Sequence, residues 1–107
     1  MSLLIEDSAI ELAASMRELL VRLARCDRDL ATQIRRATSS VALNVAEGMG
    51  RIGKDRLHHY RVAKGSALEV KAGLRLAVAF GYVSQTGVER PAQLSVLIQK
   101  LLSGLLR

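Results

Sequence analysis

Apolar residues recur three and four positions apart along most of the chain, which is the spacing of one face of an α-helix. The first stripe of this kind runs from Ile5 to Cys26, with charged residues such as Glu11 and Arg22 on the other faces. Its members are Ile5, Ala9, Leu12, Met16, Leu19, Leu23 and Cys26. The spacing predicts one amphipathic helix over this segment, with Cys26 as a buried, inert thiol.

A second stripe follows directly and predicts a second helix. Asp27 is placed to cap its start, because an aspartate side chain accepts a free N–H at a helix N-terminus. The stripe consists of Leu30, Ile34, Ala37, Val41, Asn44 and Gly48. Glycines then end the helix near Gly48–Gly50. The segment GMGRIG follows a helix and lacks the pattern of a phosphate-binding loop, so it indicates a helix-terminating turn.

A third helix is predicted from about Lys54 to Phe80, and Gly81 is placed to cap its end. Its core stripe consists of Tyr60, Ala63, Ala67, Val70, Leu74 and Ala77. The last helix contains the leucine-rich stretch from Leu94 to Leu105, and Pro91 suits its first turn. The pattern leaves open whether this helix begins at Thr86 or at Pro91.

Four helices joined by short connections predict an all-α, antiparallel up-down-up-down four-helix bundle, with residues 1–107 as a single domain. Half of the residues are hydrophobic, only three are aromatic and one is proline, a composition that favours helices over strands. One cysteine excludes an internal disulfide, and no Cys and His cluster indicates a metal or cofactor. The apolar stretches are too short to cross a membrane and the first residues are acidic, so we expect a cytoplasmic protein.

Enzymatic chemistry has little support in the sequence. His58 and His59 are adjacent, so their side chains diverge by about 100° on a helix and cannot chelate one ion together. A catalytic acid or base would have to be Glu47 or Glu69, and no nucleophile, metal ligand or second acid–base group accompanies either. We therefore interpret these carboxylates as structural and expect no catalysis.

Polar residues form one cluster on each of the two middle helices. The second helix presents Arg36, Ser40, Asn44, Glu47 and Gly48 within one arc. The third helix presents Gly65, Ser66, Glu69 and Gly73 beside its core stripe. A buried carboxylate at Glu69 would need a cationic partner. The two arcs predict a structural polar network between the helices in which Glu69 pairs with Arg36, with further hydrogen bonds from Ser40, Asn44 or Ser66.

The formal net charge is +6, and residues 54–85 carry six basic side chains against two acidic ones. Most of this excess lies on one face of the third helix, opposite its core stripe. The basic residues are Lys54, Arg61, Lys64, Lys71 and Arg75, with Arg51 nearby. They predict nucleic-acid binding through phosphate contacts without strong sequence preference. The alternative is an ordinary solvated helix face, and the lack of interleaved aromatic residues argues against base stacking.

Further apolar or small residues exceed what one small bundle needs for its core. They are Ile10, Ala13, Leu20 and Ala24 on the first helix and Val62, Leu76 and Phe80 on the third. A stripe of about 100° per helix is enough for a single bundle, so the surplus predicts burial between copies of the chain.

The two polar clusters also carry a family resemblance, which extends over roughly residues 10–106. The segments RRATSSVALNVAEGMGR and YRVAKGSALEVKAGLRLAVAFGYV resemble bacterial 23S rRNA intervening-sequence proteins. That family typically has R-A-x-x-S-[IV]-x-x-N-[IV]-A-E-G closing its second helix and A-x-G-S-x-x-E on its third. The residues that match are Arg36, Ala37, Ser40, Asn44, Ala46, Glu47, Gly48, Ala63, Gly65, Ser66 and Glu69. One departure is Leu57, His58 and His59, where the family often has aromatic residues.

The resemblance implies a compact cytoplasmic bundle that assembles as a ring-like homopentamer. A similar fold serves as the accessory protein of diversity-generating retroelements, which binds nucleic acid and a reverse transcriptase. Two functions therefore remain open. The first is a non-catalytic oligomer that associates with RNA or DNA through its basic face. The second is a structural scaffold or adaptor for a protein partner, whose basic face only keeps it soluble.

Overall fold

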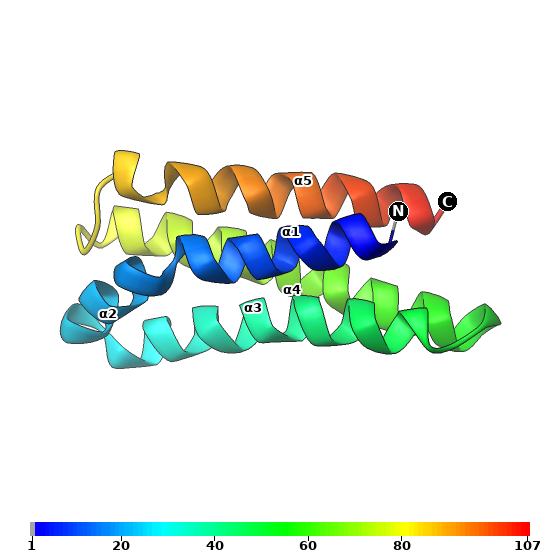
Figure 1. Ribbon diagram of the computed structural model, residues 1–107. Coiled ribbons are helices and arrows are strands. Elements are labelled where there is room, and N and C mark those ends of the chain that lie inside the picture. Colours follow the sequence, from blue (N-terminus) through cyan, green and yellow to red (C-terminus); the bar gives the residue numbers. More distant parts are fainter. Residues whose placement is uncertain (1) are drawn as a thin grey trace.

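The computed structural model describes residues 2–107, which form five α-helices and one short 3₁₀-helix. These are α1 (Ser2–Ser15), α2 (Arg17–Cys26), α3 (Arg28–Met49), α4 (Gly53–Ala79), η1 (Thr86–Val88) and α5 (Glu89–Leu105). The helices α1 and α2 follow one another as a single broken rod, and α3, α4 and α5 each reverse direction (Figure 1). The molecule measures 43 × 21 × 19 Å. The all-helical class predicted from the sequence is confirmed.

The first predicted helix is broken at Met16, which corrects the expectation of one continuous helix. The Ser15 hydroxyl donates to the Leu12 carbonyl (2.7 Å), and the Met16 N–H turns to the Ala13 carbonyl (3.2 Å). A serine that bonds to its own helix backbone in this way competes with the regular helical ladder. Met16 is nevertheless fully buried, so the apolar stripe continues across the break.

The core runs along the axis between the rods and contains the predicted stripes. Buried members from the first rod extend from Ile5 to Leu23, and those of α4 from Tyr60 to Ala77. Cys26 departs from the prediction, because it is exposed. It is the last residue of α2, where the chain leaves the core to turn into α3.

The helix ends follow the predicted capping residues. The Leu30 N–H donates to Asp27 Oδ1 at the start of α3 (3.0 Å). Gly81 has φ of +79°, a conformation that glycine adopts without strain, and ends α4. The open question about the last helix is settled, since η1 begins at Thr86 and α5 at Glu89, with Pro91 in its first turn.

Around the bundle, α3 neighbours α4, α4 neighbours α5, α5 neighbours α1, and α1 neighbours α3. The closest approach is between α3 and α4. A Cβ atom added to Gly48 would lie 2.5 Å from the Tyr60 ring, and one added to Gly73 would lie 2.6 Å from Ile34 Cγ1. Glycine at these two positions therefore allows α3 and α4 to pack along most of their length.

Candidate nucleic-acid interface

Five of the predicted nucleic-acid contacts lie on the single long helix α4. Lys54, Arg61 and Arg75 are exposed, while Lys64 and Lys71 are half-buried. At 1.5 Å per residue, the distance from Lys54 to Arg75 along the helix is about 32 Å. One rigid helix thus presents a row of cations on the side away from the core.

None of these five side chains forms an ion pair with a carboxylate of residues 2–107. The ion pairs of residues 2–107 are Arg51–Glu47, Arg51–Asp55 and Arg90–Glu11. None of the three involves a member of the row. We call Lys54, Arg61, Lys64, Lys71 and Arg75 the basic row of α4.

Arg51 differs from the basic row, because it stands between two carboxylates. Its guanidinium lies 2.6 Å from Glu47 Oε1 and 3.4 Å from Asp55 Oδ2. The hydrogen bond from Arg51, together with its charge, lowers the pKa of Glu47. Much of the positive charge of Arg51 is therefore offset, and its contact with nucleic acid stays a prediction.

Part of the predicted polar network exists, on the seam between α3 and α4. Ser66 Oγ donates to Ser40 Oγ (2.7 Å), and Asn44 Nδ2 donates to the Ser40 carbonyl (2.9 Å) and hydroxyl (3.1 Å). Asn44 Oδ1 then faces His59 Nδ1 at 3.0 Å. These four side chains, which we call the polar seam, form one hydrogen-bonded chain between the two helices.

His59 is the member of the polar seam that the sequence did not predict. Since the Asn44 amide nitrogen is engaged by Ser40, its oxygen accepts, and His59 Nδ1 carries the hydrogen. The signal was present in the spacing, because His59 and Ser66 are seven residues apart and share one face of α4.

The predicted ion pair between Arg36 and Glu69 is wrong. Both side chains are exposed, and no ion pair of residues 2–107 includes either. Glu69 lies beside Ala72 and Gly73 at the border with α3, near Gln33, rather than inside the seam. Water solvates it there, so the cost of an unpaired buried charge does not arise. Glu47 also lies outside the polar seam, where its carboxylate accepts a hydrogen bond from Arg51.

The apolar residues around Glu69 explain this error. Val62, Leu76 and Phe80 are on the same side of α4, and they are 36%, 46% and 59% exposed. Their presence suggested a buried environment for the carboxylate. They lie on the outer surface of the chain instead.

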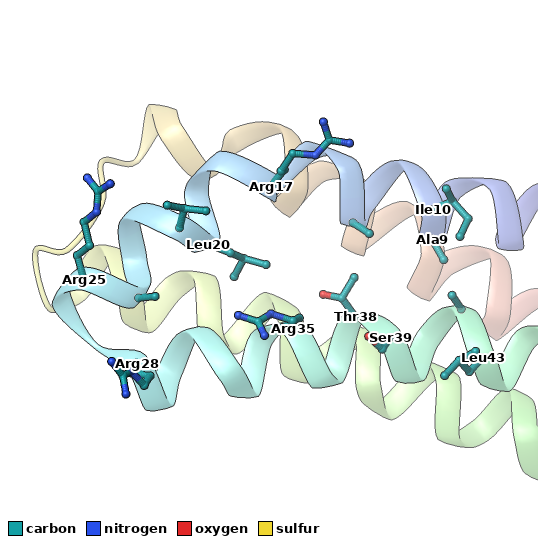
Figure 2. A pocket seen from close by; sticks show the side chains of 14 residues that line it. Ala9, Ile10, Arg17, Leu20, Arg25, Arg28, Arg35, Thr38, Ser39 and Leu43 are labelled. Carbon is teal, nitrogen blue, oxygen red and sulfur yellow. The ribbon is translucent and has the colours of Figure 1, made fainter.

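A groove of about 950 Å³ lies between the α1–α2 rod and α3 (Figure 2). Its apolar lining includes the four surplus residues of the first rod, Ile10, Ala13, Leu20 and Ala24. Arginines at positions 17, 25, 28 and 35 also line it, and no acidic residue does. The sequence did not reveal this arginine group, because its members are spread over two helices that come together only in the fold.

Other site classes find no support in residues 2–107. No group of three or more His, Cys, Asp or Glu side chains in this part could hold a metal ion. Among the described helices, none is long and apolar enough to span a membrane.

Comparison with known proteins places the chain within one family. A model described as the 23S rRNA-intervening sequence protein matches residues 1–104. A solved structure is also similar: a protein of unknown function from the S23 ribosomal protein family of Bacteroides thetaiotaomicron. The two are 22% identical, with a TM-score of 0.86 over 96% of this chain and 98% of that one. No curated protein matches.

Proposed function

Because this chain belongs to the family of 23S rRNA-intervening sequence proteins, we propose that it is a non-catalytic, self-assembling bundle protein that binds RNA or DNA. The observation that supports this function most is the basic row of α4. Lys and Arg neutralise phosphates and release counterions, which drives binding that does not depend on base sequence. We further propose that it acts in the cytoplasm.

The arrangement of the basic row favours phosphate contacts over base reading. Its cations lie on the solvent side of a helix that is packed into the bundle along its other side. Lysine and arginine contact phosphates, and α4 contains no asparagine or glutamine that could read an adenine edge beside them. The resulting affinity should be similar for unrelated sequences and should fall steeply with salt.

Assembly strengthens this proposal. The family resemblance implies five copies in a ring, which would repeat the basic row around a symmetry axis. Contacts that are weak singly then act together, because the second and later contacts form at a high effective concentration.

The experiment is a binding series across salt concentration with two unrelated RNA sequences and one duplex DNA. The native protein is compared with the triple variant Arg61→Gln, Lys64→Gln, Lys71→Gln. The matched control is Arg22→Gln, Lys100→Gln, Arg107→Gln, which removes the same charge from exposed positions outside α4. We expect the basic-row variant to lose orders of magnitude in affinity, with a salt slope smaller by about three.

The binding of the two variants separates the basic row from net charge. Strong binding by the control and weak binding by the basic-row variant supports the proposal. If both variants lose the same affinity, net charge alone explains the binding, and the basic row has no special role. No binding by the native protein at low salt would overturn nucleic-acid association and favour the scaffold or adaptor, for which a reverse transcriptase is one partner to test.

A further inference from the structure

We propose that the arginine-rimmed groove between the α1–α2 rod and α3 receives the exposed apolar ridge of α4 from a second copy of the chain. The ridge consists of Val62, Glu69, Ala72, Leu76 and Phe80. This inference rests on the self-assembly in the proposed function and specifies which two surfaces meet. It is independent of the nucleic-acid part of that function.

The shape and lining of the groove suit the binding of a helix. Its small residues Ala13, Ala24 and Ala42 leave room for another backbone to come close, and Leu20 and Leu43 add apolar surface. The α3 side, from Arg28 to Leu43, is about 22 Å long at 1.5 Å per residue. Leu43 is 68% exposed although it is leucine, so the single chain leaves this apolar surface uncovered.

The ridge on α4 is the matching surface. From Val62 to Phe80 it extends about 27 Å along one helix, which is enough to fill the length of the groove. Its apolar members are partly exposed, and Ala72 between them is small and exposed. A partly exposed, mostly apolar helix face of this length matches the open groove on the other side of α3.

The charges of the two surfaces are complementary. The groove carries Arg17, Arg25, Arg28 and Arg35 and no carboxylate. The ridge carries one charged residue, Glu69, which has no ion pair within residues 2–107. A carboxylate placed between arginines accepts charge-assisted hydrogen bonds. The role predicted for Arg36 would thus pass to an arginine of the neighbouring copy.

The positions of groove and ridge also determine how copies would follow one another. The groove lies on the α1–α3 side of the bundle, and the ridge borders α3 on the α3–α4 side. Each copy offers a groove to one neighbour and a ridge to the other, which is a head-to-tail contact. Because the two surfaces are on adjacent sides of the bundle, successive contacts turn the chain of copies, which is the geometry that a ring requires.

Two variants test the pairing, each at an exposed position so that folding is preserved. Ala13→Arg fills the groove and adds a further positive charge. The double variant Leu76→Lys, Phe80→Lys places cations on the ridge against the arginine rim. The control is Leu97→Lys on α5, a leucine of similar exposure (42%) outside both surfaces. Helix content and thermal melting confirm that each variant is folded, and sedimentation gives its mass.

We expect the native protein and the Leu97→Lys control to be oligomers, and the groove and ridge variants to be monomers. Mixing the latter two should produce a complex of one copy of each, since an intact ridge then meets an intact groove. If the groove and ridge variants are folded but remain oligomeric, the proposed pairing is wrong, although self-assembly is retained. The pairing is also wrong if a mixture of the two variants stays monomeric at the highest soluble concentration. A monomeric native protein overturns both the pairing and self-assembly, whereas nucleic-acid binding is judged by the separate salt series.

Discussion

The two sides of α3 differ in how completely the chain covers them. Toward α4, glycines at positions 48 and 73 bring the helices into contact, and the polar seam satisfies the side chains between them. Toward the α1–α2 rod, small residues such as Ala13 and Ala42 line an open groove. Small residues thus accompany close helix packing on the α4 side, whereas on the other side they line a groove that stays open between α3 and the α1–α2 rod.

This difference shows why a stripe of small residues is not by itself a core. On the α4 side the facing residue is present, as Tyr60 is for Gly48. On the groove side the facing residues are absent from the single chain. Added side-chain volume should therefore lower the stability of the fold on the α4 side of α3. On the groove side it should instead weaken the assembly of copies.

The largest effect on stability should come from adding one methyl group at the closed seam. Gly48→Ala would place a Cβ 2.5 Å from the buried Tyr60 ring, so helices or ring must shift. Overpacking of this kind costs about 1–3 kcal/mol. Chemical denaturation of the folded variant measures the loss.

The matched control is Gly65→Ala, in the middle of the neighbouring helix α4. A Cβ there meets nothing within 4 Å, so only the higher helix propensity of alanine acts. That should stabilise the protein by about 0.5–1 kcal/mol. A Gly48→Ala protein as stable as Gly65→Ala would contradict the close packing of α3 on Tyr60.

Asn44→Ala should have the next largest effect, because Asn44 links Ser40 to His59 in the polar seam. Removing the Asn44 amide leaves Ser40 and His59, both half-buried, without these hydrogen bonds. This should lower the free energy of unfolding by about 1–2 kcal/mol. Ser39→Ala is the comparison, since Ser39 is an exposed hydroxyl of α3 on the groove side. If urea denaturation gives the same midpoint for both variants, the polar seam has no stabilising role.

Much of this fold was predictable, because helix periodicity depends only on local sequence. The buried stripes, the Asp27 cap and the Gly81 cap all follow from spacing and backbone preferences. The break at Met16 was not predictable in the same way. At the break the Ser15 hydroxyl takes the Leu12 carbonyl and the Met16 N–H turns to Ala13, while the apolar spacing continues unchanged.

The candidate site was predictable only in part, because helix angles alone do not say what lies opposite. Ser40, Asn44 and Ser66 were placed correctly on the facing arcs. Glu69 was not, since a rotation of about 60° from Ser66 on the helix separates a seam position from an exposed one. The arginine group of the groove depends on how α2 and α3 come together, which no single-helix pattern contains.

The smallest effect should come from Glu47→Gln, at the exposed end of α3. The hydrogen bond from Arg51 lowers the pKa of Glu47 from its ordinary value of 4.5. The ion pair therefore stabilises the folded state above that pH, and its contribution is lost as the pH falls through the lowered pKa. Because the pair is exposed, thermal melts should differ only slightly at neutral pH. The two proteins should converge in acid, and a difference that grows as the pH falls would contradict this assignment.

Side-chain footprinting with hydroxyl radicals, applied to the native protein at rising concentration, shows whether the open side of α3 is covered by a second copy. In the single chain, Leu43 in the groove and Phe80 on the ridge are 68% and 59% exposed, while Ile52 in the α3–α4 turn is 83% exposed. We expect Leu43 and Phe80 to become protected together as copies assemble, with Ile52 labelled throughout. If Leu43 and Phe80 remain as reactive as Ile52 at every concentration, the groove and the ridge do not meet.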